Sequence, residues 1–295
     1  MPYWTDVPKS VSYFRDTGRL GDNLHVAILD QGIYTGHTDE FGSPTRVTRF
    51  SDTVGDSGVG YHGTACAGII GGATSGFLPN AHLLDGKCFD DDSTGTSLGA
   101  ITDCMDDLTA WAEAPNNVAP YDHVIVNCSF GAPGGIGGNG YATAVQAMED
   151  AGIAVFAASG NLDYNLDSSL NFFPAHDLEW GAVGAVDLRR VRTHFSNYGG
   201  MVKLHALGWG TPAPSHTTNG AFINFTGTSA ACPAAVGCYG TWATSRDAPR
   251  SQAEVWALQE EYIAGFCKKI VRKNAYDTEY SNANVFLARA DGSIA

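Results

Sequence analysis

The sequence predicts an α/β fold with three layers, in which helices cover both faces of a mostly parallel central sheet. Two observations support this prediction. Apolar runs of strand length alternate with helix-like segments along the chain, which is the pattern of a parallel sheet between helices. No Pro-rich or Ser-rich linker divides the 295 residues, so we expect a single domain that extends over residues 1–295.

The elements follow from short local patterns. Continuous apolar runs predict buried strands at 25–29, 124–128 and 152–158. Helices are predicted at 141–151 and 252–266, and small residues predict two more, after His62 and after Ser229. Pro233 is expected in the first turn of the last of these helices. The glycine-rich segment 131–140 is expected to be a surface loop, and no Lys-Ser or Lys-Thr pair follows it to make it a phosphate loop.

Asp30 directly follows the strand predicted at 25–29. Gly32 allows a tight turn behind this aspartate, and α/β sheets bind their ligands just outside the carboxyl ends of such strands. An isolated aspartate before a glycine usually makes only a turn. Asp30 is therefore a candidate functional carboxylate whose role depends on its partners.

His62 and Ser229 each lie at the start of a predicted helix of small residues. At a helix N-terminus, the Ser229 hydroxyl and its own backbone N–H face the same space, which suits the stabilisation of an oxyanion. Taken singly, such a histidine is usually structural and such a serine usually caps a helix. Together, Asp30, His62 and Ser229 follow the chain order Asp, His, Ser of the subtilisin triad, which favours a serine hydrolase.

With these residues the chain resembles the subtilases and, within them, the proteinase K-like enzymes, from about residue 4 to about residue 242. Further matching segments are 32–42, 78–81, 157–161 and 195–199. Cys66 matches a free cysteine that proteinase K-like enzymes carry beneath the catalytic histidine. The resemblance implies a subtilisin-like fold and a serine endopeptidase that hydrolyses peptide bonds.

The resemblance also implies individual roles. Ser229 is the expected nucleophile, His62 the general base and acid, and Asp30 the group that holds the imidazole tautomer. Asn161, in the turn after the strand at 152–158, matches the side-chain donor of the oxyanion hole.

A polypeptide substrate is expected to lie between two exposed backbone edges. The predicted binding residues are Ser93, Thr94 and Gly95 on one edge, Ser129, Phe130 and Gly131 on the other, and Ala157, Ala158, Ser159 and Gly160 in the S1 wall. None of them is charged, so a neutral or apolar side chain is expected before the scissile bond.

The chain departs from the family pattern at Ala65, Ala230, Cys232 and Ala234, which replace larger or polar residues next to the triad segments. Lys203 stands where proteinase K-like enzymes have a calcium-binding aspartate. An ammonium group cannot ligate Ca²⁺, so we expect no metal there and no required cofactor, with the lysine charge serving carbonyls near 174–180 instead. Asp39 and Glu40 are candidates for a different Ca²⁺ site, although two acids in a loop usually face solvent.

The net charge and the cysteine content limit the classes of binding partner and the cellular location that we expect. A net charge of −14 argues against nucleic acid and anionic membranes. Seven cysteines cannot all pair internally, and their spacing matches no zinc motif. Reduced-looking cysteines and the lack of a recognisable signal peptide favour an intracellular or virus-associated protein over a secreted one. A protein inhibitor, or a pro-peptide that is not in this chain, is a further candidate partner.

Three other functions compete with that of an endopeptidase. A binding or structural protein on the same scaffold would not need Asp30, His62, Asn161 and Ser229. A peptide ligase would use the same acyl-enzyme, and the sequence does not separate it from a protease. A lipase-type hydrolase is disfavoured because the segment around Ser229 lacks the second glycine of the nucleophile elbow.

Overall fold

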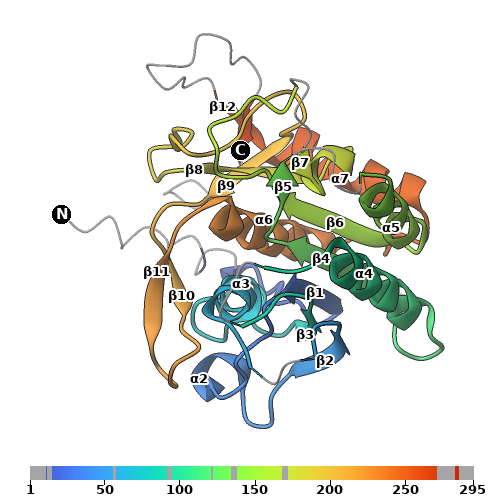
Figure 1. Cartoon of the computed structure of the whole chain (residues 1–295), viewed down its shortest axis with the longest axis vertical. Coiled ribbons are helices and arrows are strands. Elements are labelled where there is room, and N and C mark those ends of the chain that lie inside the picture. Colours follow the sequence, from blue (N-terminus) through green and yellow to red (C-terminus); the bar gives the residue numbers. More distant parts are fainter. Residues whose placement is uncertain are drawn as a thin grey trace.

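A computed structural model describes residues 11, 15–55, 58–91, 95–120, 122–133, 138–167, 172–270 and 283–285. Its centre is a nine-stranded sheet in the order β12-β13-β9-β8-β6-β4-β1-β3-β2 (Figure 1). The strands from β2 to β9 in this order pair in parallel, and β12 alone pairs antiparallel, with β13. The prediction of a mostly parallel central sheet is therefore confirmed.

The strands of the central sheet are short and largely buried. Their bounds are Leu24–Asp30 for β1, Val47–Asp52 for β2, His82–Lys87 for β3, His123–Cys128 for β4, Ile153–Ala158 for β6, Ala182–Val186 for β8, Leu204–Leu207 for β9, Lys268–Ile270 for β12 and Ala283–Val285 for β13. The three strands predicted from apolar runs correspond to β1, β4 and β6. Continuous burial of β4 and β6 is the expected pattern for strands covered on both faces.

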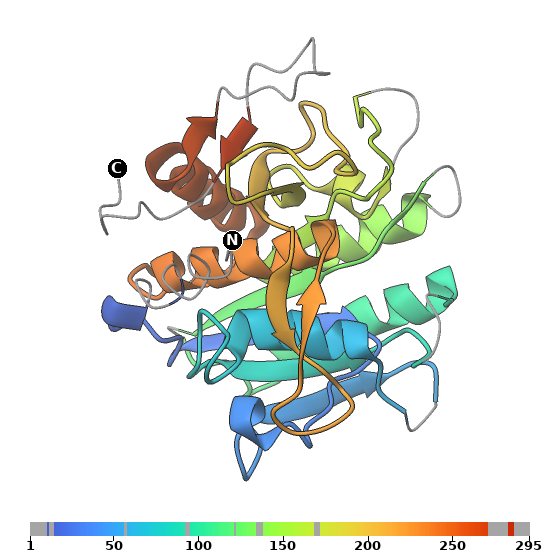
Figure 2. The same cartoon turned by 90° about the vertical axis from the view of Figure 1, so that its left-hand side faces the viewer.

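Helices cover both faces of the sheet (Figures 1 and 2). The helices α4 (Leu98–Glu113) and α5 (Gly138–Asp150) pack on one face, in a core with Leu29, Val126 and Val155. The helices α3 (Tyr61–Gly71) and α6 (Thr228–Ala243) pack on the other, with Ile28 and Phe156. The helix α7 (Gln252–Phe266) packs beside α5 and α6. The three-layer prediction is thus confirmed.

Smaller elements complete the fold. The strands β10 (Thr211–Pro214) and β11 (Phe222–Phe225) form an antiparallel hairpin that lies across α3, as Figure 2 shows. The remaining elements are the strands β5 (Ala132–Pro133) and β7 (Phe172–Phe173), which pair with each other, the short helix α2 (Thr38–Phe41) and a 3₁₀ turn at Ala175–Asp177. None of the helices in the described ranges combines the length and the apolar character needed to cross a membrane.

The glycine-rich segment differs from the prediction of a surface loop. Its start pairs with β7 as β5, and its last residues, from Gly138, belong to α5. Helical propensity of glycine is low, but α5 gains its stability from the packing of Tyr141, Val145 and Met148 against the sheet. The predicted helix at 141–151 therefore begins three residues earlier than the local pattern indicates.

The C-terminal end of α3 is held by charged groups around the buried carboxylate of Glu40. The carboxylate of Glu40 is fully buried and accepts hydrogen bonds from the backbone N–H groups of Thr74 and Ser75 at 3.1 and 3.2 Å and from both of their hydroxyls. The guanidinium groups of Arg15 and Arg46 donate to backbone carbonyls of the same loop, including those of Gly71 and Gly72. Glu40 was expected to face solvent, but it is buried, and its carboxylate oxygens already accept hydrogen bonds from these groups.

A chain of polar side chains crosses the amino-terminal edge of the sheet. His25 Nε2 lies 3.2 Å from Asp122 Oδ2, the two Nδ1 atoms of His25 and His82 are 3.2 Å apart, and His82 Nε2 lies 2.8 Å from Thr48 Oγ1. Because a carboxylate only accepts, His25 donates through Nε2, so its Nδ1 accepts from His82 and the Thr48 hydroxyl donates to His82 Nε2. Each of these four side chains has a hydrogen-bond partner when both imidazole rings are neutral.

Candidate active site

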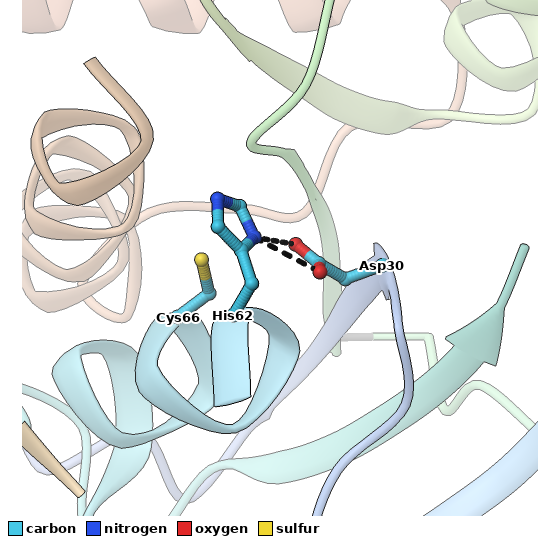
Figure 3. A group of neighbouring side chains, drawn as sticks. All are labelled: Asp30, His62 and Cys66. Carbon is cyan, nitrogen blue, oxygen red and sulfur yellow. Dashed lines mark hydrogen bonds and ion pairs between the residues drawn. The ribbon is translucent and has the colours of Figure 1, made fainter. Parts of the chain in front are cut away.

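Strand alternation aims Asp30 at α3. Residues 26 and 28 of β1 face α3 and α6, and residues 27 and 29 face α4, so Asp30 continues the α3 side. His62 lies in the first turn of α3, and its Nδ1 is 3.0 and 2.8 Å from the two carboxylate oxygens of Asp30 (Figure 3). Because the carboxylate accepts, Nδ1 carries the proton, and Nε2 is the ring atom with a free lone pair when His62 is neutral.

The electrostatics of His62 follow from the same pair. Burial lowers the pKa of the imidazole, but the charge and hydrogen bond of Asp30, with a contribution from Cys66, outweigh it and raise the pKa well above its usual value. Cys66 lies one turn further along α3, where burial raises the pKa of its thiol. The carboxylate therefore stabilises the imidazolium form of His62.

Ser229 is the second residue of α6 and borders the same pocket as His62. In the structure its hydroxyl donates to the backbone carbonyl of Ser129 at 2.9 Å, rather than to the imidazole. The Ser129 hydroxyl in turn donates to the Ser229 carbonyl at 3.0 Å. The start of α6 is thereby tied to the end of β4.

Pro233 explains why the Ser229 carbonyl is available for this contact. The proline lies in the second turn of α6 rather than in the first, as predicted. In an α-helix its backbone N–H would bond to the carbonyl four residues earlier, but proline has no N–H. The Ser229 carbonyl instead accepts from Ser129 Oγ at 3.0 Å and from Cys66 Sγ at 3.6 Å.

Asn161 is oriented by Thr228. Its Oδ1 accepts hydrogen bonds from the Thr228 backbone N–H at 2.8 Å and from the Thr228 hydroxyl at 3.0 Å. The Thr228 hydroxyl also accepts the buried N–H of Gly160 at 3.1 Å. Because a backbone N–H can only donate, Oδ1 must be the end that faces Thr228, and the amide NH₂ of Asn161 is left to donate into the pocket.

Lys87 fixes the turn that carries Asp30. This lysine is fully buried, and its ammonium group donates to the carbonyls of Gln31 at 3.1 Å and Phe89 at 2.9 Å. The backbone N–H groups of Cys88 and Phe89 donate to the Asp30 carbonyl at 2.9 and 3.2 Å. Nothing in the local sequence pattern singled out Lys87, because a lysine at a strand end is usually exposed.

One pocket of about 730 Å³ contains Asp30, His62, Asn161 and Ser229. Phe172 forms part of its wall and lies so close to Gly131 and Gly160 that a Cβ on either glycine would be 2.2 or 2.5 Å from the ring. Lining residues that were not among the predicted site residues are Gln31, Tyr61, Phe89, Thr96, Ser97, Leu98, Ile101, Ala132, Tyr141, Leu162, Phe172, Phe225, Thr226 and Thr228. Most of them come from segments without a motif, which only the tertiary fold brings to the pocket.

The predicted binding residues divide into three groups. Ser129, Phe130, Gly131, Ala158 and Gly160 line the pocket, and Gly95 is next to the lining residue Thr96. Ser93 and Thr94 lie outside the described residues. Ala157 and Ser159 were predicted in the S1 wall, but neither residue lines the pocket. Ala157 points to the α4 and α5 core because side chains alternate along β6, and Ser159 is fully buried and does not line the pocket.

The expected role of Lys203 also changes. Its ammonium group lies 5.7 Å from the centroid of the Trp180 ring, so an aromatic face rather than a set of carbonyls receives the charge. This contact does not fit Ca²⁺ at residue 203. Asp30, His62 and Cys66 have ligand atoms within 4.8 Å of one another, but His62 Nδ1 is already protonated toward Asp30 and the Cys66 thiol is neutral. This group is therefore better suited to proton transfer than to metal binding.

Comparison with known proteins places this arrangement in a family. Residues 21–270 match the Subtilase family. The chain belongs to the subtilase family. Proteinase T from Parengyodontium album is 30% identical over 292 residues, which cover 97% of this chain and 90% of that protein. A cuticle-degrading serine protease from Arthrobotrys oligospora is 30% identical over 79% of this chain and 54% of its own length.

Two solved protein structures have the same fold as this subtilase. A cold-adapted subtilisin-like serine proteinase superposes with a TM-score of 0.74 at 22% identity, over 92% of this chain and 91% of that one. The prenylagaramide maturation protease PagA superposes with a TM-score of 0.69 at 22% identity, over 88% of each chain. The predicted resemblance to proteinase K-like subtilases is confirmed, and this subtilase is a serine endopeptidase.

The departures from the family pattern lie in the packing of this subtilase. Ala65, Ala230, Cys232 and Ala234 are all buried, where α3 and α6 pack together. Small side chains allow two helices to approach closely. The replacements thus affect the support of His62 and Ser229 rather than the groups that line the pocket.

Proposed function

We propose that this subtilase hydrolyses peptide bonds with Asp30, His62 and Ser229 as its triad and Asn161 in its oxyanion hole. The observation that carries the proposal is the pair of contacts at 2.8 and 3.0 Å between His62 Nδ1 and Asp30, in the pocket that also contains Ser229. With Nδ1 protonated and held by Asp30, His62 Nε2 acts as the general base.

Acylation begins when the Ser229 side chain turns from the Ser129 carbonyl toward His62 Nε2. As Ser229 Oγ bonds to the carbonyl carbon of the substrate, its proton passes to Nε2, and Asp30 stabilises the imidazolium that forms. The C–N bond then breaks, and the proton moves from Nε2 to the leaving amine. Water attacks the acyl-enzyme with the same base, and the carboxylic acid product is released.

The oxyanion of each tetrahedral intermediate receives two donors. The NH₂ of Asn161 is one, and the backbone N–H of Ser229 at the N-terminus of α6 is the other. Both are present before the reaction, so little reorganisation is needed as the charge develops. Removing a side-chain donor of this kind typically lowers kcat by about 10²–10³-fold.

The substrate class follows from the pocket walls. Apart from Asp30 and His62, its lining residues within the described ranges are uncharged, and they include Phe172, Ala158 and the glycines at 131 and 160. We therefore expect polypeptides with an apolar or aromatic residue before the scissile bond to be cleaved faster than those with Lys, Arg, Asp or Glu there. A strong preference for a basic residue would contradict this assignment.

A fluorophosphonate probe tests the proposal, because it reacts only with an activated serine. Wild-type protein should be labelled, with the adduct on Ser229 by peptide mass spectrometry, whereas Ser229→Ala and His62→Ala should stay unlabelled. Ser215→Ala is a matched control, since this serine lies in the hairpin loop and bonds there to Thr217. Folded wild-type protein that remains unlabelled would contradict the proposal and favour a non-catalytic binding protein.

A further inference from the structure

Two histidines face each other at the amino-terminal edge of the sheet. His25 of β1 and His82 of β3 are direct partners in the parallel register, and their Nδ1 atoms are 3.2 Å apart. Two tetrahedral Zn–N bonds of about 2.0–2.1 Å would hold their nitrogen atoms about 3.3 Å apart. The separation of the two Nδ1 atoms is therefore one that a shared zinc ion requires, as well as one that a hydrogen bond allows.

The outer nitrogen of each ring is held by another side chain. His25 Nε2 lies 3.2 Å from Asp122 Oδ2, and His82 Nε2 lies 2.8 Å from Thr48 Oγ1. A histidine that binds a metal through one nitrogen usually donates its other N–H to a carboxylate or another oxygen, which fixes the ring and its tautomer. Both rings have such an oxygen, so the pair has the outer support of a metal site on both sides.

Binding of a metal ion at this pair needs the movement of one proton. In the metal-free form His25 carries its proton on Nε2, so the lone pair of its Nδ1 is already directed at His82. The proton of His82 lies on Nδ1 and must pass to Nε2 before Nδ1 can bind a cation. The Thr48 hydroxyl, which donates to Nε2 in the metal-free form, can accept from it instead. The change of tautomer therefore leaves each of these groups with a partner and releases no proton.

The surroundings of the pair suit a cation that keeps part of its hydration shell. Both imidazoles are half-buried and Thr48 is exposed, so water can reach the space beside the two rings. The carboxylate of Asp122 supplies a negative charge on the His25 side. Arg46 is a positive group near His82, and its guanidinium donates to backbone carbonyls rather than to the ring. These two charges oppose each other at the pair, so the field of the protein does not exclude a divalent cation.

We propose that His25 and His82 bind one Zn²⁺ ion through their Nδ1 atoms, with water in the remaining coordination positions. Imidazole nitrogen is a preferred ligand of Zn²⁺. His25 is the second residue of β1 and Asp30 is its last, about 17 Å further along the strand, so this site is separate from the proposed triad. The ion joins the starts of β1 and β3, whose other ends carry Asp30 and Lys87, and its role is to stabilise the fold.

Calorimetric titration of the metal-free protein with ZnCl₂ tests this site. Structural zinc sites have four protein ligands, and half of that set predicts a Kd of about 1–200 µM for the wild type, so we expect the site to be empty without added zinc. His25→Phe and His82→Phe each remove one ligand and should abolish saturable binding, and the first keeps a ring against Trp111. Asp122→Asn keeps both ligands and should raise Kd about 10-fold. In ¹⁵N NMR spectra of the wild type, Zn²⁺ should shift the Nδ1 resonances of both imidazoles.

Two controls separate this site from other zinc ligands. His194→Ala removes an exposed histidine elsewhere on the surface, and His62→Ala breaks up the group of Asp30, His62 and Cys66. Both variants should keep the wild-type Kd. The inference would be overturned if the wild type showed no saturable binding, if both phenylalanine variants kept the wild-type Kd, or if His62→Ala lost the binding, which would place the ion in the active-site pocket. If the phenylalanine variants do not fold, the Nδ1 resonances decide, and a ring that Zn²⁺ leaves unshifted would overturn the inference as well.

Discussion

Thr228 should raise the turnover of this subtilase by orienting Asn161. Thr228→Val removes the 3.0 Å hydrogen bond from the hydroxyl to Asn161 Oδ1 but keeps the 2.8 Å bond from the backbone N–H. One neutral hydrogen bond contributes about 0.5–1.5 kcal/mol, so kcat should fall about 2- to 12-fold with little change in KM. This loss is smaller than the 10²–10³-fold expected for Asn161→Ala, because the donor remains present.

The same substitution should also cost stability. The buried N–H of Gly160 loses its acceptor in Thr228→Val, at a cost of about 1–3 kcal/mol. For a chain of 295 residues this corresponds to a decrease in Tm of about 2–5 °C. Thr228→Ser keeps the hydroxyl and is the control, with most of kcat and Tm retained.

Steady-state kinetics of Thr228→Val, Asn161→Ala and the double variant separate orientation from general damage. If Thr228 acts through Asn161, its replacement should have almost no further effect on kcat in the Asn161→Ala background. An equal loss of kcat in both backgrounds would refute the reasoning. So would an unchanged kcat in the single variant.

Four further predictions concern pH and stability. The pKa of His62 is raised and the base must be neutral, so kcat/KM should rise with pH with a midpoint above 6.5. Asp30→Asn should lower that midpoint and reduce kcat by about 10⁴-fold. Profiles of kcat/KM and kcat against pH check both results. Burial, and to a smaller extent His25 and Arg46, lower the pKa of His82 in the folded protein. Its contribution to stability should therefore be present above pH 6.5 and be lost as the pH falls through the folded pKa. The Tm of His82→Ala should decrease less than that of the wild type over this pH range. Glu40→Ala leaves the backbone N–H groups of Thr74 and Ser75 without their acceptor, and calorimetry should show a loss of about 2–6 kcal/mol, or about 3–10 °C in Tm. Lys203→Met removes only the contact with Trp180, so Tm should fall by about 1–2 °C, and EDTA should lower the wild-type Tm by less than that; a larger effect of EDTA would indicate a Ca²⁺ site elsewhere.

The sequence was most informative where a motif and a strand end coincide. Asp30 could be placed at the carboxyl end of β1 and Ser229 at the start of α6, because an apolar run and a run of small residues define these elements locally. The mostly parallel sheet and the two-sided helix layers then followed from the alternation of strands and helices, whereas the order of the strands was not predicted.

Features that depend on distant contacts could not be predicted in the same way. Phe172 enters the pocket wall only because β7 pairs with β5, and Lys87 is buried only because two backbone carbonyls converge on it. The Ala157 prediction failed because the turn motif was extended back into β6, where alternation directs this side chain to the other face. The contact between His25 and His82 joins residues on β1 and β3, and neither residue belongs to a motif.

Pro233 has a mechanical consequence for this enzyme. In an ordinary helix, the first carbonyls bond only within the helix, so a nucleophile at its start would move with the helix as an independent rod. Here the missing N–H releases the Ser229 carbonyl to the side chains of Ser129 and Cys66, which belong to the end of β4 and to the helix of His62. The start of α6, the helix that carries His62 and the end of β4 are thus joined at one oxygen atom, so in the proposed mechanism a displacement of α6 is transmitted to the groups that support the base and the substrate.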